Sequence, residues 1–212
     1  MMRATPETAI AAQLQEAARL HAELPAAQRA LIAKAAVLMT RALTVGQKII
    51  WCGNGGSATQ SQHMAAEFVG RFQRERRSLA SISLTENMAS VTAIGNDYAF
   101  DRIFSRQLEG LAQRGDVIVG LSTSGNSANV LQALRRAREL KLATIGLTGG
   151  LGGQMVTSCD VCICVPSTVT ARIQEVHLTI GHILCGLVEE MFLSSAASVL
   201  PTRRRATTSS AR

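Results

Sequence analysis

From residue 48 to residue 193 the sequence alternates short apolar runs with longer amphipathic stretches. The runs are rich in Ile, Val and Leu and end in small polar residues, which is typical of buried strands. The stretches between them show helical spacing of their apolar residues. Strands that alternate with helices pair in parallel, so the sequence predicts a doubly wound parallel sheet of the α/β class.

The predicted strands cover residues 48–52, 79–84, 116–121, 142–147 and 160–165. The predicted helices that follow them cover 58–72, 87–95, 101–113, 127–140, 152–157 and 170–193. Two further amphipathic helices, 6–23 and 26–44, precede the first strand. A chain of 212 residues suits one such domain better than two. We therefore predict a single domain at 1–193 with an N-terminal helical pair.

The chain carries a formal net charge of +7, and four of these charges are Arg203, Arg204, Arg205 and Arg212. The remaining excess of about +3 is modest, so we expect no nucleic-acid partner. Residues 194–212 are rich in Ser, Thr, Ala and Arg and lack aromatic side chains, which predicts a disordered basic tail. We expect neither an export signal nor an apolar run of membrane-spanning length, and hence a cytoplasmic protein without a membrane partner.

Five cysteines in a chain without an export signal do not predict a disulfide framework. Cys159, Cys162 and Cys164 lie in or beside the last predicted strand. No second cysteine pair lies at the spacing of a zinc ribbon, so we interpret them as small hydrophobic residues of a buried strand.

A glycine-rich turn, Cys-Gly-Asn-Gly-Gly-Ser at 52–57, follows the first strand and opens a helix. Gly53, Gly55 and Gly56 permit positive φ and close approach of a ligand, and the helix that begins near Ser57 directs amides and a dipole at an anion. The alternative is a tight turn that needs small residues for steric reasons alone.

A second loop, Leu-Ser-Thr-Ser-Gly-Asn-Ser at 121–127, follows the third strand and also opens a helix. Its hydroxyl groups and helix-terminal amides form a neutral anion cradle; the alternative is an ordinary helix cap with additional serines. Ligands of doubly wound sheets bind at the carboxyl ends of the strands, where both loops lie. Two such loops together favour a phosphorylated ligand.

His63 and Glu67 lie at i and i+4 on the helix after the glycine turn, so they share a face and can act on the ligand, hold a metal, or form only a surface pair. On the last helix Gln174 and His182 are about 12 Å apart along the axis and some 80° around it, and can flank a ligand. His177 points about 140° away from His182 and is interpreted as a packing histidine.

Five motifs occur here in a specific order. They are Cys-Gly-Asn-Gly-Gly-Ser at 52–57, His63-x-x-x-Glu67, Gly95-Asn96-Asp97, the stretch 121–129, and Arg172-Ile-Gln-Glu-x-His. Together they resemble the sedoheptulose-7-phosphate isomerases, or phosphoheptose isomerases, of the SIS (sugar isomerase) superfamily, over about residues 8–193.

The resemblance implies a flavodoxin-like three-layer α/β sandwich with a central parallel sheet of five strands. It also implies a homotetramer with active sites at subunit interfaces, in which the N-terminal helices take part in oligomerisation. The implied reaction is the aldose–ketose isomerisation of D-sedoheptulose 7-phosphate to D-glycero-D-manno-heptose 7-phosphate through an enediol(ate), the first step of nucleotide-heptose biosynthesis.

The resemblance further implies roles for individual residues. Glu67 and His182 would be the acid/base pair, and one zinc ion per subunit would be held by His63, Glu67, Gln174 and His182. Residues expected to contact the substrate are Asn54, Gly55, Gly56, Ser57, Glu67, Arg71, Asn96, Asp97, Ser122, Thr123, Ser124, Ser127 and Gln174. Ala171 stands where some of these isomerases have an Asp, so an auxiliary role for that carboxylate does not carry over.

Two other functions share this fold. One is a non-catalytic adaptor that associates with the replication initiator, and the presence of both Glu67 and His182 favours the enzyme over it. The other is a sugar-phosphate sensor attached to a transcription regulator, which we disfavour because no helix-turn-helix segment accompanies the domain.

Overall fold

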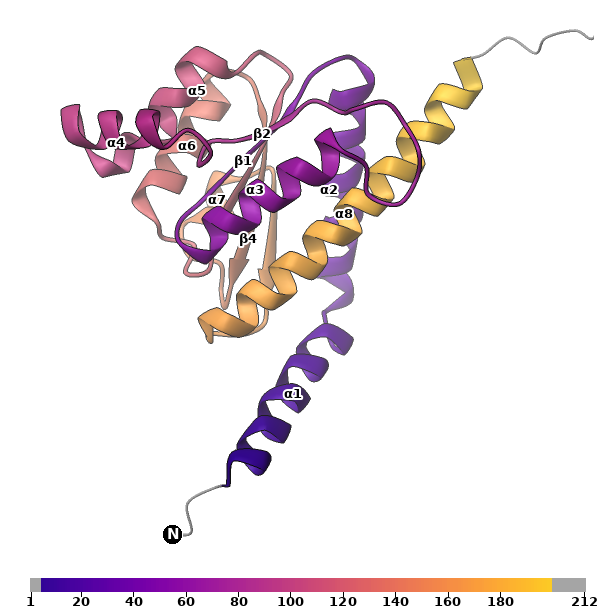
Figure 1. Ribbon diagram of the computed structural model, residues 1–212, viewed down its shortest axis with the longest axis vertical. Coiled ribbons are helices and arrows are strands. Elements are labelled where there is room, and N and C mark those ends of the chain that lie inside the picture. The colour runs from indigo at the N-terminus through magenta and orange to yellow at the C-terminus, as the bar shows by residue number, and fades with distance from the viewer. Residues whose placement is uncertain (1–4, 200–212) are drawn as a thin grey trace, which may run out of the picture.

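A computed structural model describes residues 5–199 of the chain, in which five parallel strands form one sheet in the order β2-β1-β3-β4-β5 (Figure 1). The strands are β1 (Ile49–Gly53), β2 (Ser81–Ser83), β3 (Val117–Ser122), β4 (Ala143–Gly149) and β5 (Val161–Val165). This is the flavodoxin-like order: all strands are parallel, and the direction in which successive strands are added to the sheet reverses between β1 and β3. The predicted class, strand number and parallel pairing are confirmed.

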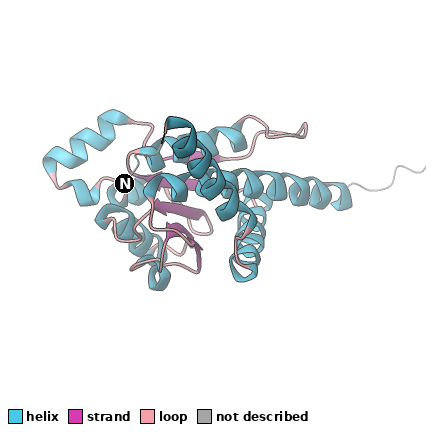
Figure 2. Ribbon diagram, turned by 90° about the horizontal axis from the view of Figure 1, so that it is seen from below, coloured by secondary structure: helices cyan, strands magenta, loops and turns pink. Residues whose placement is uncertain are grey.

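Helices cover both faces of the sheet (Figure 2). One buried cluster joins the sheet to α2, α3 and α8, and a second joins its other face to α5, α6 and α7. The helices are α1 (Pro6–Ala22), α2 (Ala26–Thr44), α3 (Gly56–Val69), α4 (Met88–Asp97), α5 (Ser105–Leu111), α6 (Ala128–Glu139), α7 (Met155–Ser158) and α8 (Thr170–Val199), with a 3₁₀ turn η1 at Phe100–Arg102. All residues of β1 and β3 are buried, because layers on both faces exclude water from these central strands.

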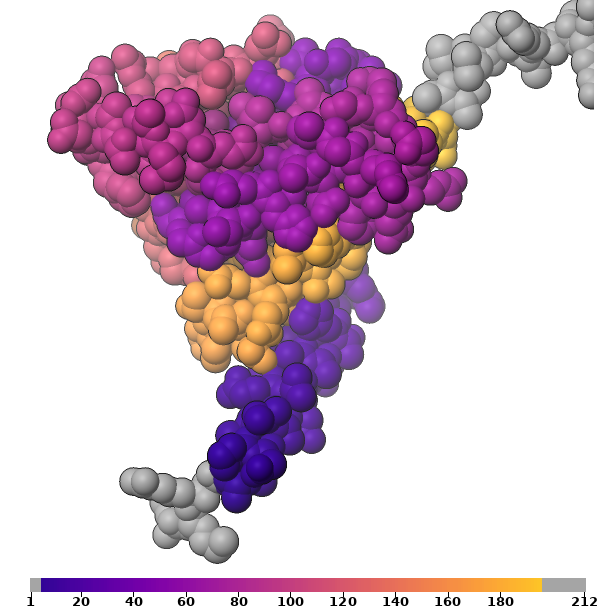
Figure 3. All heavy atoms as spheres, in the orientation of Figure 1, coloured from indigo at the N-terminus to yellow at the C-terminus, as the bar shows by residue number. Residues whose placement is uncertain are grey.

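Helix α1 extends away from the rest of the fold (Figures 1 and 3). It is joined to α8 by two contacts. The Nε2 of His21 lies 2.9 Å from the hydroxyl of Thr179, and Arg172 donates to the carbonyl of Gln13 at 2.8 Å. The apolar side chains of Ile10 and Leu14, one turn apart, are 60% and 65% exposed. Oligomerisation through this helix stays a prediction, and the exposed apolar residues are compatible with it.

Two predicted helix boundaries are wrong. The helix predicted at 101–113 is split into η1 and α5. Helix α8 continues past residue 193 to Val199, so the first six residues of the predicted tail are helical. Ser194 and Ser195 donate their hydroxyls to the carbonyls of Glu190 and Met191, which satisfies these polar groups within the helix. The rest of the predicted tail, 200–212, lies outside the described residues.

The stretch Thr170–Ser195 of α8 is long and apolar enough to cross a membrane by length and composition, contrary to the expectation from sequence. Half of its apolar 18-residue window is buried inside the fold. Its apolar composition is therefore explained by packing against the sheet and α2, and it is weak evidence for a membrane span.

All five cysteines are free thiols. In β5, Val161, Ile163 and Val165 point into the core, whereas Cys162 and Cys164 are only half-buried on the other face. The prediction of a strand is confirmed, but its cysteines are less buried than expected, since β5 is at the edge of the sheet.

Candidate active site

The loops that follow β1 and β3 meet at the switch point of the sheet and enclose a cavity of about 290 Å³. The residues that line it are Asn54, Gly55, Gly56, Ser57, Leu121, Ser122, Thr123, Ser127, Thr170 and Gln174. The structure thus brings together the two loops that the sequence singled out, and adds the start of α8 as a third wall. We call this cavity the cradle.

Steric constraints explain why residues 53, 55 and 56 of the first loop are glycines. Gly55 has φ +54° and ψ −123°, a conformation that favours glycine. A Cβ on Gly53 would lie 2.8 Å from the Cβ of Ser57, and one on Gly56 would lie 2.7 Å from Nε2 of Gln174. The steric interpretation of the turn is therefore confirmed, since small residues let α3 begin directly at the cradle, and anion binding at this turn stays a prediction.

In the second loop, the hydroxyls of Ser122 and Ser127 lie 2.8 Å apart, and Ser122 is 4% exposed. The carbonyl of Thr123 accepts from the amide of Gly149 at 3.1 Å, which fixes the loop on the end of β4. Ser124 does not line the cradle itself: its hydroxyl lies 3.5 Å from that of Ser122 and accepts from the amide of Asn126 at 3.2 Å, and the residue lines a neighbouring cavity.

Sequence reasoning missed Asn129, although it stands in the quoted stretch 121–129. The side-chain amides of Asn54 and Asn129 form a reciprocal pair, with both N···O distances 2.8 Å. Asn129 is 2% exposed. The pair joins the loop after β1 to the first turn of α6 and holds the two walls of the cradle together.

Beside the cradle, α3 and α8 bring His63, Glu67 and His182 together. His63 Nε2 lies 3.0 Å from Glu67 Oε1 and 3.5 Å from His182 Nε2. The ring of Phe72 stacks on His182 with centroids 5.6 Å apart. His63 and Glu67 are therefore more than a surface pair on one helix, because a residue from α8 completes the group.

This cluster fits a divalent metal ion. One ligand atom from each of the three side chains lies within 4.8 Å of the others. Two imidazole nitrogens and one carboxylate oxygen are ligand types that zinc binds in catalytic sites. Gln174 is not joined to this group by a contact within residues 5–199; its carboxamide lies against Gly56 in the cradle.

A buried ion pair that the sequence analysis missed lies next to the cluster. Arg76 and Glu189 are paired at 2.9 Å, and each side chain is 2% exposed. Arg76 also donates to the carbonyl of Glu67 at 2.9 Å. Glu189 accepts from the amides of the loop after α3, so the pair fixes the end of the helix that carries Glu67.

Besides Ser124 and Glu67, three further predicted substrate contacts do not line the cradle of the single chain. Arg71 has a side chain that is 59% exposed and lies 3.7 Å from Glu75. Asn96 donates to Asp97 at 2.9 Å, and both lie at the end of α4, which projects from the body (Figure 1). Their roles stay predictions that depend on a neighbouring subunit or on movement of these segments.

His177 is a packing histidine, as predicted. It is 1% exposed, and its Nε2 lies 3.1 Å from the carbonyl oxygen of Thr148 at the end of β4. Burial lowers the pKa of His177 from 6.5 to about 4, although the hydrogen bond to Thr148 opposes the shift. The imidazole is therefore neutral near pH 7.

This burial predicts a specific loss of stability in acid. Between pH 6.5 and 4 the unfolded chain binds a proton at His177 that the folded chain does not, so the free energy of unfolding falls as the pH falls. At pH 4 the loss in the free energy of unfolding reaches about 3 kcal/mol. Denaturant titrations at several pH values should show that His177→Gln reduces this slope. Equal slopes for the wild type and His177→Gln would contradict the assignment.

Comparison with known proteins gives consistent findings. The family model described as SIS domain matches residues 13–149. The chain is 55% identical over 163 residues to the phosphoheptose isomerase of Rhodospirillum rubrum, covering 77% of this chain and 87% of that protein. It is 50% identical over 192 residues to that of Solidesulfovibrio magneticus, covering 91% and 94%.

Solved structures agree with the sequence relatives. The phosphoheptose isomerase of Neisseria gonorrhoeae superimposes with a TM-score of 0.83 at 42% identity, covering 88% of this chain and all of that one. That of Francisella tularensis gives a TM-score of 0.84 at 35% identity, with the same coverage. The similarity therefore includes α8, which lies beyond the match to the family model.

Proposed function

The chain belongs to the SIS domain family and, within it, to the phosphoheptose isomerases, and from that premise we propose that it interconverts sedoheptulose 7-phosphate and D-glycero-D-manno-heptose 7-phosphate. The observation that carries this proposal is the position of the His63, Glu67 and His182 cluster beside the cradle. His63 is about 10 Å along α3 from Gly56, a separation comparable to the length of an extended seven-carbon sugar phosphate.

The cradle would hold the phosphate by neutral donors. The hydroxyls of Ser57, Ser122, Thr123 and Ser127 line it or its entrance. Gly55 and Gly56 leave their amides without a backbone acceptor among residues 5–199. Ser124 would need to turn toward the ligand. Asn54 and Gln174 in the cradle would contact the sugar hydroxyls. Further contacts would come from three residues that lie outside the cradle of the single chain: Arg71, Asn96 and Asp97.

Glu67 is proposed to move the proton. Isomerisation removes a proton from the carbon beside the carbonyl and returns it to the neighbouring carbon. A single carboxylate can serve both carbons, because they are one bond apart. His182, 3.5 Å from His63, is placed to carry protons among the sugar oxygens as the carbonyl and hydroxyl exchange positions.

Zinc is the proposed cofactor, one ion per subunit, with His63, Glu67 and His182 as ligands and Gln174 as the fourth. When bound, zinc would act as a Lewis acid that stabilises negative charge on the substrate oxygens. Gln174 would have to leave its contact with Gly56 to join the other three. The mixed nitrogen and oxygen donor set supports zinc over softer metals.

A homotetramer in the cytoplasm is the proposed state of the enzyme. Two observations support an assembly in which subunits complete one another's sites: Ile10 and Leu14 on α1 are exposed, and Asn96 and Asp97 on the projecting α4 do not line the cradle of their own chain. The adaptor alternative has no observation in its favour, since the acid/base residues lie together with a metal-compatible histidine.

The activity is tested directly by incubating purified, zinc-loaded protein with sedoheptulose 7-phosphate and following aldoheptose 7-phosphate by NMR. Equilibration of the two sugars supports the proposal. If the loaded protein leaves the ketose unchanged, the proposed activity is wrong.

Removal of the metal is expected to lower turnover by about 100-fold or more, because the carbonyl would lose its Lewis acid. Dialysis against a chelator followed by addition of Zn²⁺ should restore the rate. His63→Ala should bind less zinc by elemental analysis, while His21→Ala, which lies on α1, should bind the wild-type amount. Full turnover in metal-depleted protein would exclude a catalytic metal.

A further inference from the structure

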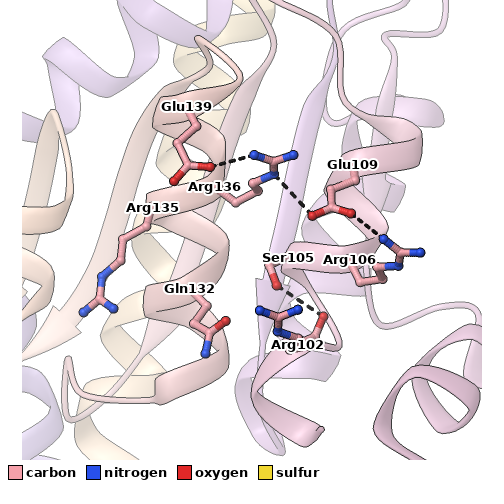
Figure 4. A pocket seen from close by; sticks show the side chains of 8 residues that line it. All are labelled: Arg102, Ser105, Arg106, Glu109, Gln132, Arg135, Arg136 and Glu139. Atoms are coloured by element: carbon pink, nitrogen blue, oxygen red, sulfur yellow. Dashed lines mark hydrogen bonds and ion pairs between the residues drawn. The ribbon is translucent and has the colours of Figure 1, made fainter. Parts of the chain in front are cut away.

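A second cavity, of about 370 Å³, lies between α5 and α6, on the sheet face opposite α3 and α8 (Figure 4). The residues that line it are Arg102, Ser105, Arg106, Glu109, Gln132, Arg135, Arg136 and Glu139. The proposed isomerase activity uses none of these side chains. We call this cavity the arginine cavity.

The lining carries four arginines and two glutamates, a net charge of +2. Glu109 forms ion pairs with Arg106, at 2.7 Å, and with Arg136, at 3.4 Å. Glu139 forms an ion pair with Arg136, at 2.6 Å. Both acids are therefore already neutralised by arginines of the same cavity.

Two guanidinium groups have no such partner. Those of Arg102 and Arg135 form no ion pair or hydrogen bond within the described part of the chain. The Nε of Arg136 is paired with Glu109, at 3.4 Å, and is not counted with these two. Cationic donors are thus left unsatisfied at the wall of a cavity, which is the arrangement that binds an anion.

The geometry favours an elongated anion over a single phosphate. Figure 4 shows Arg102 and Ser105 on one wall, and Gln132 with Arg136 on the other. Gln132 and Arg136 are one helical turn apart, about 6 Å. Arginine forks bind phosphoryl oxygens in pairs, and a hydroxyl and an amide add neutral donors. The volume lies in the range of small-molecule sites.

We propose that the arginine cavity is a binding site for a small metabolite with a diphosphate group, separate from the cradle. Arg102 binds one phosphoryl group, and Arg136 binds the other through the Nη2 that its pairs with Glu109 and Glu139 leave free. Ser105 and Gln132 donate to the phosphoryl oxygens. The side chain of Gln132, now bonded to Asp101 at 2.6 Å, turns to the ligand. Arg106, whose guanidinium lies 5.1 Å from the centre of the Tyr98 ring, links the cavity to the end of α4.

The test is calorimetric titration of the full-length protein with ADP, in the absence of divalent metal. Arg102→Gln breaks no ion pair and should weaken ADP binding about 10-fold; Arg102→Gln combined with Arg136→Gln should weaken it about 100-fold. Arg114→Gln, an exposed arginine outside the cavity, is the matched control and should bind ADP as the wild type does. AMP, with one phosphoryl group, should bind at least tenfold more weakly than ADP.

A cradle variant, Ser122→Ala with Ser127→Ala, distinguishes the two sites. It should lose sugar-phosphate turnover but keep the affinity for ADP. Loss of ADP binding in this variant would place the ligand in the cradle and overturn the proposal. So would an Arg102→Gln protein that binds ADP normally, or a wild-type protein that does not bind it. None of these outcomes depends on the isomerase activity, so the two proposals can fail separately.

Discussion

Glu67→Gln is expected to reduce turnover of sedoheptulose 7-phosphate by roughly 10²- to 10⁴-fold, the range that a positioned general base contributes. The substitution keeps the size of the side chain and removes its ability to accept a proton. The carboxylate now lies 3.0 Å from His63 and has a side chain that is only 23% exposed, so solvent cannot easily replace it as the base.

Two measurements separate proton transfer from metal binding, because Glu67 is also a proposed ligand. Proton exchange with deuterated water at the carbon beside the carbonyl should be lost in the variant, and zinc content should be measured on the same sample. Glu75→Gln is the matched control: that side chain is 89% exposed and should support normal turnover. Wild-type rates in Glu67→Gln would exclude the carboxylate as the base.

Much of the fold was predictable because its signals are local. A short apolar run such as 117–121, within the predicted strand 116–121, is typical of a strand covered on both faces, and parallel pairing follows from the helices between such strands. The order of strands is not a local property. The resemblance implies only a flavodoxin-like sheet of five strands, and it is the observed order that brings Gly55 and Ser122 to one cavity.

The parts of the site that escaped prediction depend on contacts between distant residues. Asn129 looks like one more polar residue near a helix start, and only the fold shows that it faces Asn54, 75 residues away. Glu189 and Glu190 are neighbouring residues of the same type, yet the side chain of Glu189 is buried and that of Glu190 is exposed. A helix as apolar as α8 does not reveal which of two glutamates faces the core.

That difference makes Glu189→Gln the second decisive variant, with Glu190→Gln as its neighbour control. The Glu189 carboxylate accepts from the amides of Phe72, Gln73 and Arg74, at 2.7 to 3.1 Å, and from Arg76. Burial by itself raises the pKa of Glu189, but these donors outweigh it, and the net pKa lies below the ordinary value. The group is therefore ionised in the folded protein, at the centre of a network of donors.

We expect Glu189→Gln to lower the free energy of unfolding by about 3–5 kcal/mol, because it leaves the Arg76 guanidinium buried without its counter-charge. Glu190→Gln should change it by less than about 1 kcal/mol, since its side chain is 62% exposed and lies 3.7 Å from Arg74. Denaturant titrations at pH 7 measure both values. Similar values for the two variants would show that the pair contributes no more than a surface contact.

The same variant tests whether the buried pair positions Glu67. Arg76 donates to the carbonyl of Glu67, so loss of its partner should loosen the end of α3 and lower turnover, even under conditions where the protein remains folded. Hydrogen exchange should then rise in the last turn of α3, while the start of α3 at the cradle keeps its protection, because the amide of Ala58 is bonded to Gly55 at 2.9 Å, a contact that Arg76 does not touch. Uniform loss of protection along α3 would instead indicate global destabilisation, and Arg76 would have no positioning role.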